Sequence, residues 1–85
     1  MNQTIMSPER VSELIRAGVP GAEVRVESDD NVHFAALVIA TQFTGLRPIA
    51  RHQLVYRALG ALMGREIHAL SIEALTPEER ARNSV

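Results

Sequence analysis

The side chains of this 85-residue chain that could do chemistry are its three histidines, His33, His52 and His68. Neutral imidazole is a common ligand for zinc, iron and copper, and it titrates near physiological pH. The chain has no cysteine, so it offers no thiolate ligand, thiol nucleophile or disulfide. Its sequence also lacks a glycine-rich phosphate loop and a serine-nucleophile motif, and it shows no paired carboxylates in an obvious cleft. We therefore expect a protein that is not an enzyme, and whose histidines either bind a metal or stabilise the fold.

The elements that position these histidines can be predicted from local sequence signals. Ser7 suits the cap of a helix that starts at Pro8 and that Gly18 ends. Residues 22–28 alternate apolar and charged side chains, which predicts a half-buried strand. The apolar run at residues 32–43 is typical of a central strand that is covered on both sides or nearly so.

The second half of the chain predicts a helix, a strand and a further helix. Apolar side chains at helical spacing predict a helix over about residues 50–63. A strand is expected over residues 66–72. Thr76 and Glu79 then have the spacing of a capping box, which opens a short last helix.

This order predicts a single α+β domain over residues 1–85, with an ordered core from about residue 5 to residue 80. Two strands of one sheet that are joined by a crossover helix run parallel and make a right-handed connection. The second and third strands should therefore be parallel, and the first should be antiparallel to the second. Both long helices then cover one face of a three-stranded mixed sheet, in the order α-β-β-α-β-α.

Composition favours a soluble, cytoplasmic protein. Apolar residues make up 46% of the chain, enough for a globular core. The N-terminus does not have the charged and apolar regions of a signal peptide, and no apolar run is long enough to span a membrane. The net charge of −1 gives no overall attraction to nucleic acid, although residues 43–85 carry six arginines against four acids.

The topology predicts that two of the histidines lie close together. His33 and His68 each stand near the start of a strand, and parallel strands start at the same rim of a sheet. Strand alternation groups each histidine with aliphatic side chains that should face the helices, so both rings are expected on the helix-covered side. These aliphatic residues are Leu37 and Ile39 for His33, and Leu70 and Ile72 for His68.

Two histidines alone make an incomplete metal site. A closed zinc site needs four ligands and a catalytic one usually three. Asp29 and Asp30 in the preceding turn could contribute, and otherwise the missing ligands must come from another molecule. The alternative is that His33 caps a turn and His68 forms a hydrogen bond at a strand end.

The helix over residues 50–63 carries a second candidate site. Arg47, Arg51 and Arg57, together with His52, could bind phosphate groups of a nucleic acid. The arginines lie mostly off the apolar face of the helix, so a solvated helix surface would look the same. His52 stands at the edge of that face and could instead be a partly buried structural residue. Among these residues only one aromatic side chain, Tyr56, could stack on bases.

Several short motifs, in this order and spacing, resemble the BolA family of BolA and IbaG-like proteins. The resemblance covers about residues 5–80 and includes a fold related to the type II KH arrangement. The motifs are "HF" at 33–34, "FTGL" at 43–46, "RHQLVY" at 51–56, "IHALSI" at 67–72 and "TPEE" at 76–79.

The resemblance implies an adaptor that binds a monothiol glutaredoxin and shares a [2Fe–2S] cluster with it. Thiolates would come from the glutaredoxin and from glutathione. His68 of the "HAL" strand and His33 would be the ligands from this chain. Such an adaptor would serve iron–sulfur cluster trafficking or iron, redox and stress regulation, and without its partner it would be a monomer or a weak homodimer.

The same family resemblance implies an alternative function, a DNA-binding transcriptional regulator. Its binding residues would be those of the basic helix: Arg47, Arg51, His52 and Arg57. The chain departs from the family pattern at two positions. Gln53 stands where a third basic residue is common, and Arg80 stands where the last helix commonly carries an apolar anchor.

Overall fold

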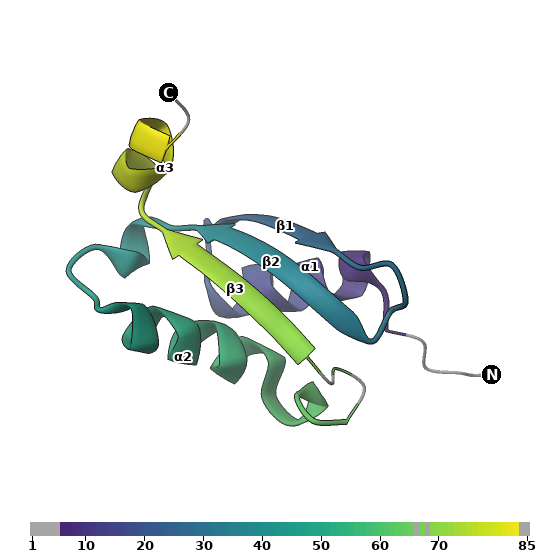
Figure 1. The fold of residues 1–85 in the computed structure, drawn as a ribbon. Helices are drawn as coiled ribbons and strands as arrows, with labels where there is room; N and C mark the ends of the chain where they lie inside the picture. The colour runs from purple at the N-terminus through teal and green to yellow at the C-terminus, as the bar shows by residue number, and fades with distance from the viewer. Residues whose placement is uncertain (1–5, 66, 68, 84–85) are drawn as a thin grey trace.

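The computed structural model describes residues 6–65, 67 and 69–83. It confirms the predicted α+β fold with a three-stranded mixed sheet (Figure 1). None of the described helices is long and apolar enough to cross a membrane. The elements, in chain order, are α1 (Pro8–Gly18), β1 (Glu23–Glu27), β2 (His33–Ile39), the 3-10 turn η1 (Thr41–Phe43), α2 (Pro48–Leu59), the 3-10 turn η2 (Gly60–Leu62), β3 (Ala69–Leu75) and α3 (Pro77–Asn83).

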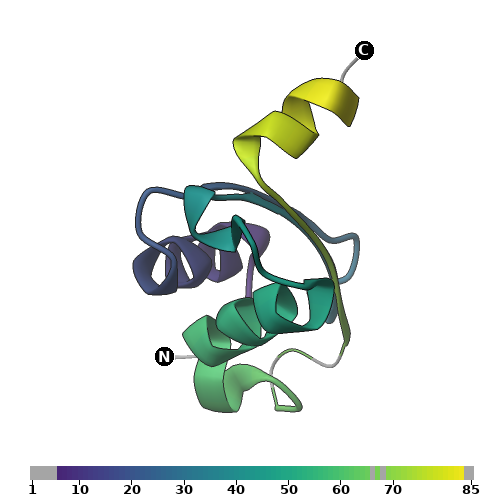
Figure 2. The same cartoon turned by 90° about the vertical axis from the view of Figure 1, so that its left-hand side faces the viewer.

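The sheet has the predicted strand directions. Strand β2 lies in the centre, antiparallel to β1 and parallel to β3. The parallel register pairs His33 with Ala69 at one end and Ile39 with Leu75 at the other. Helices α1 and α2 both lie on one face of the sheet, and α3 follows β3 beyond its end (Figures 1 and 2).

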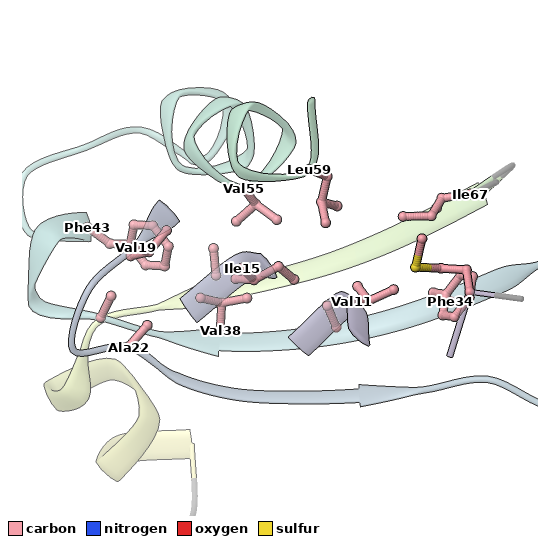
Figure 3. Packing of buried hydrophobic residues seen from close by; sticks show 14 residues of the cluster. Val11, Ile15, Val19, Ala22, Phe34, Val38, Phe43, Val55, Leu59 and Ile67 are labelled. Carbon is pink, nitrogen blue, oxygen red and sulfur yellow. The ribbon is translucent and has the colours of Figure 1, made fainter. Parts of the chain in front are cut away.

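The core fills the space between the sheet and the two long helices (Figure 3). Its largest fully buried side chains include Ile15 of α1, Val38 of β2 and Val55 of α2. Helices α1 and α2 also touch each other directly. A Cβ atom on Gly18 would overlap the Cβ of Ala58 and would lie 2.9 Å from its Cα. The absence of a side chain at Gly18 therefore allows the two helices to approach this closely.

The predicted helix caps are confirmed. The Ser7 hydroxyl accepts a hydrogen bond from the backbone N–H of Arg10 at 3.1 Å. At α3, the Glu79 N–H donates to the Thr76 hydroxyl at 3.2 Å, and the Thr76 N–H donates to Glu79 Oε1 at 2.9 Å. These reciprocal bonds form the expected capping box.

Three elements differ from the prediction. The apolar run over residues 32–43 is a strand only as far as Ile39, and Thr41–Phe43 form the 3-10 turn η1; the described helices cover one face of this strand, where coverage of both was expected (Figures 1 and 2). Helix α2 starts at Pro48 and ends at Leu59, where Gly60 adopts a φ of 58° that favours glycine and is followed by a 3-10 turn. Strand β3 continues to Leu75 instead of ending at residue 72, because its pairing with β2 extends that far. The predicted start of this strand, at Glu66 and His68, lies outside the described residues.

Candidate metal-ligand site

The turn between β1 and β2 is organised by the carboxylate of Asp30. Its Oδ1 accepts hydrogen bonds from the backbone N–H groups of Val32 and His33, both at 2.9 Å. The Ser28 hydroxyl accepts from the N–H of Asn31 at 2.9 Å, and Asn31 has the left-handed φ of 59°. The hydrogen bonds from the backbone and ring of His33 hold the pKa of Asp30 well below its usual value. Asp30 is therefore ionised across the physiological range.

This carboxylate also determines which nitrogen of His33 carries a proton. His33 Nδ1 lies 2.7 Å from Asp30 Oδ2. An ionised carboxylate can only accept a hydrogen bond, so Nδ1 must donate, and in the neutral ring Nε2 keeps the lone pair. Metal-binding histidines commonly donate their second ring nitrogen to a carboxylate in this way, which orients the ring and raises its basicity as a ligand. The His33 side chain is 68% exposed and is accessible to a ligand from solution.

The face of the sheet on which His33 lies differs from the prediction. In β2, Phe34, Ala36 and Val38 are buried against the helices, whereas His33 lies on the opposite, open face. The prediction that its ring lies on the helix-covered side is therefore wrong. Strand β2 is apolar on both faces, so the sequence has no alternation that could identify the buried one. Leu37, which was used as a guide, is half-buried on the open face.

The second predicted ligand, His68, lies outside the described residues. The next residue, Ala69, is paired in register with His33 across β2 and β3. Among the residues that the structure describes, no group of three or more His, Asp or Glu side chains could hold a metal ion. Asp29 lines a shallow hollow of about 300 Å³ beside His33, together with Glu27 and Ser28. The described part of the site thus offers one oriented imidazole with acidic side chains around it.

The predicted basic helix does not present its arginines equally. Arg51 was expected mostly off the apolar face, but its side chain is only 11% exposed. Its guanidinium forms a forked pair with Glu79, donating to Oε1 at 2.7 Å and to Oε2 at 3.3 Å. It also donates to the carbonyls of Leu46 and Ala74, at 2.9 and 3.0 Å, and lies over the ring of Phe43.

The Arg51–Glu79 pair attaches α3 to the rest of the fold. Hydrogen bonds from Arg51 and from the Thr76 backbone lower the pKa of Glu79 to about 2. None of the residues of α3 is buried, so this pair and the capping box help to hold the helix where apolar burial does not.

The other three residues of the predicted basic patch are not engaged in this way. Arg47 and Arg57 are exposed at the two ends of α2, and His52 is half-buried. The exposed cations of this helix are therefore separated along it.

Sequence reasoning did not find the orienting role of Asp30, which it treated only as a further ligand without a fixed position. A signal was present in the Asp-x-x-His spacing at a turn, because an aspartate there commonly accepts hydrogen bonds from the backbone two or three residues later. The Arg51–Glu79 pair had no such signal, since its members are 28 residues apart.

The comparisons with known proteins all indicate the same family. Residues 16–79 match the family model of BolA-like protein. The chain is 41% identical over 59 residues to BolA-like protein 1 of Homo sapiens, an alignment that covers 69% of this chain and 43% of the human protein. A Vibrio cholerae protein named DNA-binding transcriptional regulator BolA is 45% identical over 47 residues, or 55% of this chain and 44% of that protein. The chain thus spans less than half the length of these two relatives.

A solved structure of a BolA homologue from Coxiella burnetii has the same fold. Its TM-score to this chain is 0.73 at 39% sequence identity, and the match covers 96% of this chain and 100% of that one. The family model, the relatives and the shared fold agree with one another. The chain belongs to the BolA-like family.

Proposed function

We propose that this protein is an adaptor that binds a monothiol glutaredoxin and co-ligates a [2Fe–2S] cluster through His33 and His68. The observation that carries the proposal is the exposed imidazole of His33, whose Nδ1–H is held by Asp30 so that Nε2 keeps the lone pair. The chain supplies no thiolate, so the remaining ligands come from the glutaredoxin and from glutathione.

The donor set suits such a shared site. Iron–sulfur clusters are commonly held by thiolates, and histidine replaces cysteine on one iron in some centres, which raises the reduction potential. Imidazole must be deprotonated to bind a metal, so ligation by this chain weakens in acid. Within this chain, Asp30 orients the ring of His33, and Ala69, which follows His68 in the sequence, is paired with His33 across β2 and β3.

The test is to mix the purified chain with a cluster-loaded monothiol glutaredoxin and to record visible absorption and circular dichroism. We expect a spectrum that differs from that of the glutaredoxin alone. His33→Ala and His68→Ala should each reduce the change, and His52→Ala serves as the matched control because it removes the one remaining histidine of the chain.

An unchanged spectrum with the wild-type chain would refute the cluster proposal. If His33→Ala leaves the spectral change intact while His68→Ala reduces it, then His68 is a ligand and His33 is not.

A second candidate function is binding of DNA in transcriptional regulation. It is supported by the name of the Vibrio cholerae relative and by the exposed Arg47 and Arg57 of α2. Each neutralised phosphate contributes about −0.9 to the slope of log affinity against log salt concentration. Arg47→Ala and Arg57→Ala should therefore each flatten this slope by about one, whereas Arg65→Ala, an exposed arginine beyond α2, should leave it unchanged. If the affinity of the wild-type chain for DNA does not depend on salt concentration, the chain does not bind DNA through its phosphate groups.

A further inference from the structure

No helix in the described part of the chain covers the open face of the sheet (Figures 1 and 2). Helices α1 and α2 lie on the other face, and α3 lies beyond the end of the sheet (Figure 2). The centre of the open face carries small or apolar side chains, Ala35 and Leu37 of β2 and Ser71 of β3. They line a shallow hollow of about 380 Å³.

Two opposite charges flank this centre in a single row. The register pairs Arg25 of β1 with Leu37 of β2, and Leu37 with Glu73 of β3. Arg25 and Glu73 are both exposed, and neither forms an ion pair or a hydrogen bond with another residue in the described part of the chain. The two charges thus stand on opposite edges of the sheet, two strand spacings or about 10 Å apart, with Leu37 between them.

This pattern is complementary to itself under one symmetry operation. A two-fold axis parallel to β2 stacks a second copy face to face, with its β1 over β3 of the first copy. Arg25 of each copy then lies over Glu73 of the other, and Leu37 meets Leu37. An axis along the row of charges would instead oppose Arg25 to Arg25. Two stacked sheets keep their strands within about 30° of each other, which the first arrangement satisfies.

We propose that the chain forms a two-fold symmetric homodimer through the open face of its sheet, with two reciprocal Arg25–Glu73 ion pairs around a Leu37–Leu37 contact. In such an interface both copies use the same patch, so Arg25 of each copy contacts Glu73 of the other. The complementarity of this one row, in which Arg25 meets Glu73 on either side of Leu37, favours a second copy of this chain as the occupant.

The area of the face predicts a weak dimer. Strands of five, seven and seven residues, side by side, give a face of roughly 300 Å² on each copy. Specific, stable interfaces bury at least about 1,200 Å² in total. The dimer should therefore form only at high protein concentration and should weaken as salt screens the ion pairs.

Sedimentation velocity from micromolar to millimolar concentration tests the dimer. We expect the sedimentation coefficient of the wild-type chain to rise with concentration. Arg25→Glu and Glu73→Arg each convert both ion pairs into like-charge contacts, and each should raise the dissociation constant about tenfold or more. The double variant R25E/E73R restores opposite charges and should recover most of the wild-type association. Arg57→Glu makes the same charge change on α2, away from this face, and should have a small effect.

A second measurement identifies the contact itself. In a mixture of isotope-labelled and unlabelled chains, filtered nuclear Overhauser spectra should show contacts between the Leu37 methyl groups of the two copies. A chain that stays monomeric throughout the concentration range would overturn the proposal. Association that the double charge swap does not restore, or that proceeds without a Leu37–Leu37 contact, would overturn it as well.

Discussion

The Asp30 carboxylate links the backbone of the β1–β2 turn to the ring of His33. One oxygen accepts the N–H groups of Val32 and His33, and the other accepts the Nδ1 proton of His33. The position of the ring and the identity of its protonated nitrogen therefore depend on the same side chain. Because the pKa of Asp30 is depressed, the carboxylate stays ionised as the pH falls through the range in which histidines titrate.

Asp30→Ala should change the tautomer of His33. Without the acceptor, the population of the Nδ1-protonated neutral ring should fall and that of the Nε2-protonated ring should rise. Long-range proton–nitrogen spectra of the imidazole distinguish the two tautomers directly. Asp29→Ala is the matched control. This substitution removes the same charge from the same turn, but Asp29 forms no hydrogen bond with another described residue. An unchanged tautomer in Asp30→Ala would contradict the orienting role.

At the scale of elements, the Arg51–Glu79 ion pair attaches α3 to α2. Arg51 of α2 binds the Glu79 carboxylate through two nitrogens, and Glu79 also accepts the N–H of Thr76 at the start of α3. Burial of apolar side chains contributes little to this helix, since none of its residues is buried. The attachment of α3 should therefore depend on the ionisation of Glu79.

Glu79→Gln should destabilise the docking of α3 at neutral pH, and the difference from wild type should vanish in acid. The pKa of Glu79 is about 2 in the fold against an ordinary 4.5, so the stabilisation is present above about pH 4.5 and is lost as the pH falls toward 2. Amide hydrogen exchange of α3, measured over a pH series, should show this convergence. Glu78→Gln, the exposed neighbour, should behave like wild type at every pH.

The contact between α1 and α2 gives a second prediction at this scale. Gly18→Ala would gain less than the roughly 1 kcal/mol of helix propensity that holds in a helix interior, because Gly18 is the last residue of α1. It would also place a Cβ against Ala58, and overpacking of this kind costs about 1–3 kcal/mol. The new Cβ would meet the Ala58 backbone as well as its side chain, so the cost should exceed the gain. Urea denaturation should show a net loss of stability, which should be smaller in an Ala58→Gly background. A net gain in stability would show that the helices can separate without cost.

Over the whole molecule, local patterns predicted the fold well because its boundaries are encoded locally. Ser7, Gly18 and the Thr76–Glu79 box mark helix ends within a few residues, and the crossover rule then determined the strand directions. Local sequence patterns could not predict on which face of the sheet His33 lies, nor that Arg51 is nearly buried. The first depends on which of two apolar faces the helices cover, and the second on a partner 28 residues away.

His33 lies on the same open face as the proposed dimer contact, which connects the two proposals. A second copy stacked on this face would cover the ring, so dimerisation and ligation through His33 should exclude each other. Addition of cluster-loaded glutaredoxin should therefore remove the Leu37–Leu37 contact from the filtered spectra. Persistence of that contact in the cluster-bound complex would show that the two surfaces are independent.

The bond between Arg51 and the Ala74 carbonyl has a consequence for solubility. In β3, the Leu75 carbonyl points toward β2, where it accepts the N–H of Ala40, so the preceding carbonyl of Ala74 points toward the outer edge of the sheet. Unpaired edge strands can recruit strands of other chains and start aggregation, and proteins commonly protect them with charged side chains. Arg51 occupies this outer carbonyl with a cation at 3.0 Å. The residue that attaches the last helix thus also leaves one acceptor fewer at this edge for a strand of another chain.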